Sequence, residues 1–253
     1  MKSSIMIYDL ESTPHMGLYF GRAYDVNIAK TVKTGYVMGF AWKFLGEKKA
    51  HSCYIWDFPL YKKQPRNDIE VIKKWVELVQ KSSVLVGHNS DSFDNKVMMG
   101  RVMVHKLPPI ALPQTVDTKK AIKRIARFDS NKLDDLGEMF GIGRKIKTDI
   151  DLWWDCMQGV KKAQALMVEY NKQDVYLTEE LYLLERSYMV NHPNMANIED
   201  RPNACPKCLA EDGFWAQGFR ITKTAKYRRF QCKSCGSYVS NRGKSPERSP
   251  DYV

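Results

Sequence analysis

Five residues in three segments carry acidic or phenolic groups at spacings that suit metal-assisted chemistry. Asp9 and Glu11 are two positions apart at the end of an apolar run, so the alternation of a strand turns both side chains to one side. Asp94 follows a second apolar run, and Tyr170 and Asp174 share a face of a long helical segment. Because neighbouring carboxylates repel one another unless a cation neutralises them, these acids predict a divalent metal site.

The side-chain types also indicate a reaction. Hydrolysis of a phosphodiester adds negative charge to a phosphate that is already charged. Two Mg²⁺ or Mn²⁺ ions about 3.5–4 Å apart can activate the water and stabilise the leaving oxygen. Such hard ions prefer oxygen ligands to thiolates. The hydroxyl of Tyr170 lies one turn before Asp174, where it would orient the attacking water.

Three ordered motifs resemble those of the DEDD exonuclease superfamily in its tyrosine branch: Asp9-x-Glu11, Asn89-x-x-x-Phe93-Asp94 and Tyr170-x-x-x-Asp174. The spacing is most similar to the proofreading domain of family B DNA polymerases, and the resemblance covers about residues 5–185. It implies a ribonuclease-H-like fold and stepwise 3′→5′ removal of mononucleotides. Glu169 stands where the histidine branch has its histidine, which favours Tyr170 as the fifth residue.

The same resemblance implies individual roles for the four acids. Asp9 would contact both ions, Glu11 and Asp174 would hold the ion on the nucleophile's side, and Asp94 would act partly through water. Four neighbouring residues are expected to support the substrate through backbone, hydroxyl or ring contacts: Ser12, Thr13, Asn89 and Phe93.

Other polar residues near these motifs are expected to have structural roles. Asp91 is expected to cap the helix that follows it, and Asn67 or Asp68 to cap an earlier one. His88 and Asp117 are expected to serve as hydrogen-bonding supports rather than as ligands.

Four of the six cysteines form a second pattern. Cys205 and Cys208 are followed after 23 residues by Cys232 and Cys235, which makes two Cys-x-x-Cys pairs. Four thiolates at this spacing predict one structural Zn²⁺ in a zinc ribbon. A redox role for either pair is the alternative. Because so short a segment buries little core, zinc would supply much of its folding energy.

The segment between the cysteine pairs mixes aromatic and basic residues. Its candidate nucleic-acid contacts are Arg220, Lys226, Arg228 and Arg229. Arginines neutralise phosphates while aromatic rings stack on bases, so the pattern favours binding of a single strand. Two alternatives remain, in which the aromatic residues fill a small core or the surface binds a protein.

Hydrophobic patterns predict the elements that would position these groups. Strands are expected at 5–8, 35–44, 51–56, 84–86 and 115–117, and helices at 68–80, from about 92, at 133–140 and at 160–188. In the last helix, Ala163, Leu166 and Met167 are expected to face inward. Strands alternating with helices after a hairpin predict an α/β fold with a mixed sheet flanked by helices.

Composition and charge separate the chain into parts. Residues 1–195 are expected to form the exonuclease domain, 204–240 the zinc ribbon and 241–253 a disordered tail. The net charge of +11 is uneven, because residues 201–253 hold 11 Lys and Arg against 4 Asp and Glu. The start of the chain does not look like a signal peptide, and no apolar stretch approaches the roughly 20 residues of a membrane span. A reducing, cytoplasmic compartment and no membrane partner are therefore expected.

The preferred substrate is DNA, either single-stranded or at 3′ ends. RNA is the nearest alternative because no residue is assigned to read the 2′-hydroxyl. A non-catalytic nucleic-acid-binding module is the alternative from another class. The chain of 253 residues holds no polymerase domain, so any proofreading would need a separate polymerase or repair protein as partner.

Overall fold

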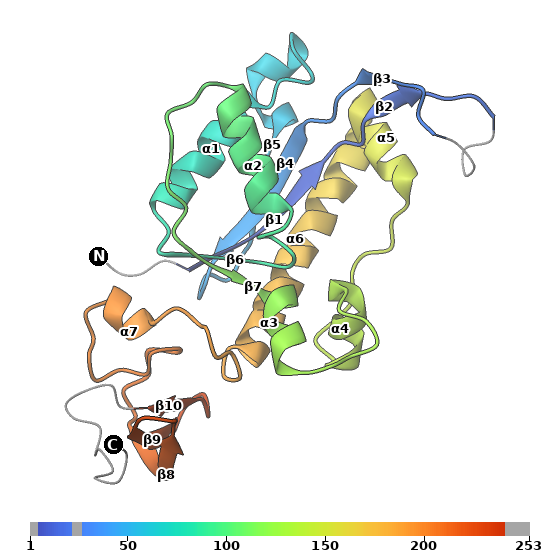
Figure 1. Ribbon diagram of the computed structural model, residues 1–253. Coiled ribbons are helices and arrows are strands. Elements are labelled where there is room, and N and C mark those ends of the chain that lie inside the picture. The colour runs from blue at the N-terminus through green and yellow to red at the C-terminus, as the bar shows by residue number, and fades with distance from the viewer. Residues whose placement is uncertain (1–4, 22–26, 241–253) are drawn as a thin grey trace.

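A five-stranded mixed sheet lies at the centre of the computed structural model, which describes residues 5–21 and 27–240 (Figure 1). The strands have the order β5-β4-β1-β6-β7. Their bounds are β1 Ile5–Ser12, β4 Val37–Phe44, β5 His51–Tyr54, β6 Val84–Gly87 and β7 Gln114–Asp117. β4 is antiparallel to β1 and β5, whereas β6 is parallel to β1 and β7. The predicted mixed sheet is confirmed.

Helices cover both faces of this sheet. They are α1 Ile69–Gln80, α2 Asp94–Val104, α3 Thr118–Ile125, α4 Leu133–Met139, α5 Ile150–Gln158, α6 Lys161–Glu185 and α7 Met195–Ile198. Two 3₁₀ helices, Ile55–Asp57 and Pro59–Lys62, follow β5. The strand and helix positions predicted from hydrophobic spacing are confirmed within a few residues, but α3, α5 and α7 were not predicted. No helix in the described ranges has the length and apolar character needed to cross a membrane.

Successive side chains of β1 point to opposite faces of the sheet, so they pack in two different core clusters. Met6 and Tyr8 pack in the cluster that contains Trp75 of α1, whereas Ile5 and Ile7 pack in the cluster that contains Val175 of α6. The Tyr8 hydroxyl donates to Oδ1 of Asn95 in α2 at 2.6 Å, which links the strand to that helix. Since Trp75 is fully buried, its replacement by alanine should cost about 3–5 kcal/mol. β1 is therefore held from both sides at the position where it carries its acids.

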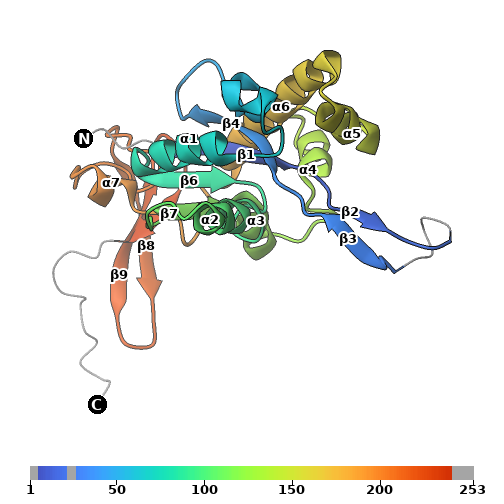
Figure 2. The ribbon, with the colours of Figure 1, turned by 90° about the horizontal axis from the view of Figure 1, so that it is seen from above.

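Two smaller sheets lie outside this body. β2 (Met16–Leu18) and β3 (Lys30–Lys33) form an antiparallel pair that projects away from the body in Figure 2 and was not predicted. β8 (Phe214–Ile221), β9 (Lys226–Cys232) and β10 (Tyr238–Ser240) form a three-stranded sheet. In Figure 1 this second sheet lies at the other end of the molecule from β2 and β3.

Two sequence predictions in the C-terminal half need correction. Leu166 is 39% exposed, because it lies at the edge of the stripe on α6 that buries Ala163 and Met167. The segment just after α6 was expected to end the first domain, but it continues into α7, whose Met195 is fully buried in the same core cluster as Ile5. The three predicted domain boundaries remain predictions, and the tail 241–253 lies outside the described residues.

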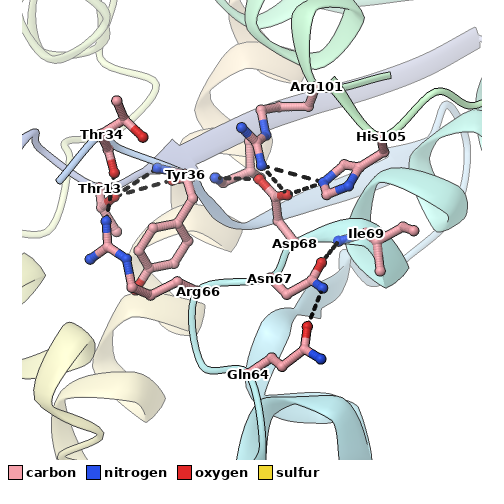
Figure 3. Close-up of polar contacts among 11 residues, drawn as sticks. Thr13, Thr34, Tyr36, Gln64, Arg66, Asn67, Asp68, Ile69, Arg101 and His105 are labelled. Atoms are coloured by element: carbon pink, nitrogen blue, oxygen red, sulfur yellow. Dashed lines mark hydrogen bonds and ion pairs between the residues drawn. The ribbon is translucent and has the colours of Figure 1, made fainter. Parts of the chain in front are cut away.

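Either Asn67 or Asp68 was expected to cap α1, and the side chain of Asp68 does not do so. Its carboxylate is fully buried and accepts from Nη2 of Arg101 at 2.7 Å and from the backbone N–H of Val37 at 2.9 Å, with Nε2 of His105 at 2.5 Å (Figure 3). Asn67 instead accepts from the N–H of Ile69 at 3.1 Å. Burying a carboxylate is costly without partners, and this set provides them. The contact ties the start of α1 to α2 and to the start of β4.

Candidate active site and cysteine cluster

β1 and α6 bring three acids together. Asp9 and Glu11 lie on the face of β1 that α6 covers, and Asp174 projects from the middle of α6. One carboxylate oxygen from each of the three residues lies within 4.8 Å of the others. Asp174 is far from Asp9 and Glu11 in the sequence, so the fold brings it to them. A site of this size and donor set fits hard divalent cations.

Neighbouring side chains orient the two acids of β1. Nδ2 of Asn171, in α6, donates to Oδ2 of Asp9 at 2.7 Å and to its carbonyl oxygen at 3.2 Å. Nε1 of Trp153, in α5, donates to Oε2 of Glu11 at 3.1 Å. Sequence reasoning missed both supports, because an Asn or Trp in a helix has no spacing that would single it out.

Asp94 approaches from the other side of the strand. It occupies the first position of α2, is 5% exposed, and accepts from the backbone N–H of Leu10 at 3.1 Å. That N–H lies between Asp9 and Glu11 in the chain, so Asp94 stands beside the cluster. It does not belong to the group of three oxygens within 4.8 Å.

Burial raises the pKa values of all four acids, and repulsion within the cluster adds to it for Asp9 and Glu11. Desolvation is the largest cause in each case, and it raises the pKa of Glu11 to about 8 and that of Asp94 to about 7. The pKa of Asp9 is raised by desolvation and then by the charge of Asp174, whose own pKa is also raised. Ionising all four at neutral pH therefore requires added positive charge, which a divalent cation would supply.

Lys145 supplies part of that positive charge within the chain. Its Nζ lies 2.6 Å from Oδ2 of Asp174 and 5.0 Å from the centroid of the Tyr170 ring. Burial alone would lower the pKa of this ammonium, but the charges of Asp174 and Asp9 raise it above its usual value. Sequence reasoning missed Lys145, which comes from the irregular segment between α4 and α5 and follows no periodic pattern.

Tyr170 lies at the edge of the cluster, one helical turn before Asp174. Its side chain is largely buried, and its ring meets that of Trp153 edge to face, with centroids 5.8 Å apart. Burial and then the charge of Asp174 raise the pKa of its hydroxyl to about 12. The phenol thus keeps its proton at neutral pH and can donate a hydrogen bond.

The four residues expected to contact substrate have different surroundings. Ser12 ends β1 and is partly exposed, and Phe93 is 45% exposed just before α2. Thr13 is buried, and its hydroxyl accepts from the N–H of Tyr36 at 3.0 Å, so this hydroxyl already has a partner within the protein. Asn89 adopts a positive φ of 70°, which asparagine tolerates better than most residues.

Contacts around Asp117 fix the loop that leads to Asp94. The Asp117 carboxylate accepts from the backbone N–H groups of Asn89 at 3.0 Å and Lys120 at 3.1 Å. Its expected structural role is confirmed. Asp91 does not cap α2, however, because its carboxylate accepts instead from Lys120 Nζ at 3.1 Å and from Nδ2 of Asn95.

The expected supporting role of His88 is also confirmed. Its two ring nitrogens lie 2.9 Å from Oγ1 of Thr118 and 3.0 Å from the carbonyl oxygen of Asn131. Burial lowers its pKa to about 4, so the ring is neutral at physiological pH.

The four paired cysteines converge at the other end of the molecule. Their Sγ atoms all lie within 4.8 Å of one another, with Cys205–Cys235 and Cys208–Cys232 each at 3.8 Å. These separations are far longer than the roughly 2.05 Å of a disulfide. Four sulfurs at about 2.3 Å from a tetrahedral zinc would be separated by about 3.8 Å, so the set fits Zn²⁺.

The sheet beside these cysteines exposes the predicted basic residues. Arg220, Lys226, Arg228 and Arg229 are all exposed. Trp215 is 54% exposed and Phe219 is 46% exposed, whereas Phe214 and Phe230 pack against each other at 6.5 Å. The aromatic residues are thus divided between a small core and an open surface.

Comparison with known proteins defines the class of the chain. The sequence matches the family RNase_H_2, described as RNase_H superfamily, over residues 36–184, and the chain belongs to this superfamily. The predicted ribonuclease-H-like fold is thereby confirmed. The match includes Asp94, Tyr170 and Asp174 but begins after Asp9 and Glu11.

A solved structure shares the fold. The chain is similar to the family B DNA polymerase from the hyperthermophilic archaeon Pyrobaculum calidifontis, with a TM-score of 0.54 and 16% identity. The similarity covers 74% of this chain and 25% of that polymerase. No curated protein matches the chain. Together with the acidic cluster, the superfamily and fold support a nuclease that acts on nucleic acid with divalent metal ions.

Proposed function

We propose that the chain is a metal-dependent 3′→5′ exonuclease of the tyrosine branch of the DEDD superfamily, acting on single-stranded DNA or 3′ ends. The observation that carries this proposal is the meeting of Asp9, Glu11 and Asp174 within 4.8 Å, with Asp94 hydrogen-bonded to the strand between them. The similarity to a DNA polymerase fold supports DNA over RNA.

In this proposal the four acids hold two Mg²⁺ or Mn²⁺ ions, which would activate water and neutralise charge on the phosphate. Asp9, Glu11 and Asp174 are the direct ligands. Asp94 contributes from its separate position beside Leu10 through an intervening water. Ser12 and Phe93 then face the terminal nucleotide, and Asn89 holds the loop before Asp94.

The remaining residues position the reacting groups. The protonated Tyr170 donates a hydrogen bond that orients the attacking water. Asn171 and Trp153 keep the carboxylates of Asp9 and Glu11 pointing at the site. Lys145 balances the charge of Asp174 and stabilises the anionic phosphate during attack.

The C-terminal part of the proposal is a zinc ribbon, residues 204–240, that assists nucleic-acid binding. Cys205, Cys208, Cys232 and Cys235 bind Zn²⁺ as thiolates, which requires a reducing compartment. The exposed Arg220, Lys226, Arg228 and Arg229 contact phosphates next to open aromatic rings. Tethering this surface to residues 1–195 raises the local substrate concentration. A separate polymerase or repair protein would be the partner in proofreading.

A labelled-oligonucleotide assay tests the nuclease and its direction. Single-stranded DNA and RNA of one sequence, labelled at the 5′ end, are incubated with Mg²⁺ and the full chain. We expect DNA products shortened one nucleotide at a time from the 3′ end, and no products with Asp9→Asn. Faster cleavage of RNA would reassign the substrate. Binding without cleavage under Mg²⁺ or Mn²⁺ would contradict the enzyme and favour the binding module.

A further inference from the structure

The β2–β3 pair forms an arm rooted beside the carboxylate cluster. We use "the arm" for its described residues, 13–21 and 27–36. One side continues β1 just after Glu11, and the other leads into β4, whose Val37 pairs with Ser12. Figure 2 shows the arm projecting from the body at this end. A polymer that reaches the cluster therefore arrives next to the arm.

The root of the arm is fixed to the body. The Thr13 hydroxyl accepts from the N–H of Tyr36 at 3.0 Å (Figure 3). Nη2 of Arg66 donates to the carbonyl oxygen of Thr34 at 2.6 Å, and its guanidinium carbon lies 4.8 Å from the centroid of the Tyr36 ring. These contacts hold both segments of the arm at its root, so the direction of the arm relative to the carboxylate cluster is defined.

Beyond the root, the arm exposes large apolar side chains. They are Leu18 at 59%, Tyr19 at 50%, Phe20 at 86%, Ile28 at 63% and Val32 at 51% exposure. An isolated two-stranded pair has no core in which to bury such groups. Clustered exposure of this kind on a protein surface marks a binding site.

The charges of the arm favour an anionic polymer. Its described residues include Lys30 and Lys33 but no Asp or Glu. Across the strands, Lys30 pairs with Leu18 and Lys33 pairs with Met16, so each lysine lies beside an apolar side chain. Protein interfaces are depleted of lysine at their centres. A single nucleic-acid strand, by contrast, offers phosphates to lysines and flat bases to aromatic rings.

We propose that the arm binds the unpaired strand of a nucleic acid and guides its end into the carboxylate cluster. Tyr19 and Phe20 stack on bases, and Lys30 and Lys33 contact phosphates. The proposed binding of the strand depends only on the arm. The proposed delivery of its end to the carboxylate cluster also rests on the proposed nuclease function.

Fluorescence anisotropy with a labelled 12-nucleotide DNA strand tests the binding without cleavage. The full chain carries Glu11→Gln and Asp174→Asn in every sample, and no Mg²⁺ or Mn²⁺ is added, so that no product forms while the zinc stays in place. One variant adds Tyr19→Ala with Phe20→Ala, and another adds Lys30→Gln with Lys33→Gln. The matched controls are Tyr188→Ala, an exposed aromatic outside the arm, and Lys48→Gln with Lys49→Gln in the turn at the opposite end of the sheet.

The two arm variants should change binding in different ways. Loss of both aromatic rings should weaken the affinity for the strand at least about thirtyfold, since each lost stacked base lowers it at least about fivefold. Loss of the two lysines should reduce the slope of log affinity against log salt by about 1.4, since each single-strand phosphate contact contributes about 0.7. The controls should bind like the parent. Because the substituted side chains are exposed, melting temperatures should not change.

If both arm variants bind the strand as tightly as the parent, the proposal is overturned. If they lose as much affinity for a blunt duplex as for the single strand, the assignment to single strands is overturned. A cleavage assay of the arm variants without the Glu11 and Asp174 substitutions distinguishes a failure of this proposal from a failure of the nuclease proposal. The arm variants should lose kcat/KM on the 12-nucleotide strand but keep it on a dinucleotide. If the chain cleaves neither substrate, the nuclease proposal fails while the anisotropy result still decides the role of the arm.

Discussion

The two candidate metal sites, one in the body of the molecule and one at its C-terminal end (Figure 1), differ in what holds them together. The carboxylate cluster is carried by β1 and α6, which pack in cores of fully buried side chains such as Tyr8 and Val175. The cysteine cluster is carried by turns beside a three-stranded sheet in which most side chains are at least partly exposed. The first site should exist without its metal, whereas the second should require it.

Removing zinc should produce the largest effect. Binding of structural zinc contributes about 10 kcal/mol or more to small domains, so the segment 204–240 should unfold when zinc is chelated. Hydrogen exchange should accelerate in β8 and β9 while β1 and β4 stay protected. Adding back Zn²⁺, but not Mg²⁺, should restore protection. Equal loss of protection in β1 would contradict the claim that only the cysteine site needs its metal in order to fold.

Asp174→Asn should abolish cleavage with the fold intact. Losing one ligand removes several kcal/mol of charge stabilisation, so the rate should fall about a thousandfold. Without added Mg²⁺ the melting temperature should change little, because the weaker contact with Lys145 is offset by removal of a charge that repels Asp9 and Glu11. Asp151→Asn, at an exposed acid in the first turn of α5, is the control. A large drop in the melting temperature would show that Asp174 is structural.

Lys145→Gln should show how much the positive charge of Lys145 stabilises the carboxylate cluster when no metal is bound. Without metal, losing the contact with Asp174 should cost about 2 kcal/mol of stability. With saturating Mg²⁺ the cost should shrink, since the ion takes over the same charge. Thermal melts with and without Mg²⁺ measure this difference, with the exposed Lys147→Gln as control. An equal cost in both conditions would argue against metal binding at the cluster.

The pH dependence of stability tests the charge balance of the carboxylate cluster without any substitution. Glu11 and Asp94 have pKa values raised to about 8 and about 7, so the folded state binds protons more tightly than the unfolded state. Their stabilising contribution is complete below about pH 4 and is lost as the pH rises to about 8. Without added Mg²⁺ or Mn²⁺, the melting temperature should therefore fall by about 10 °C or more across this range. Glu11→Gln should reduce the fall, and an unchanged slope would contradict the assignment.

Hydrophobic spacing was sufficient to predict the main strands and helices, because β1, β6 and α6 have clear apolar patterns. It also indicated which acids would converge, since strand ends and one helix face carry them. The supports of the site could not be predicted in this way. Lys145 and Trp153 reach the cluster through tertiary packing, and Asp68 finds Arg101 and His105 only when α1 and α2 lie together. The arm was missed because its exposed residues follow no buried pattern.

The position of α6 in the sequence has a consequence for the synthesis of the protein. Asn171 holds Asp9 across a separation of 162 residues, and Tyr170 and Asp174 come from the same helix. A nascent chain that still lacks α6 has the arm, β1 and α2 but only part of its ligand set. Such a chain lacks Asp174, so it cannot yet assemble the three carboxylates that lie within 4.8 Å of one another. The hydrolytic centre is completed only after most of the domain has been translated.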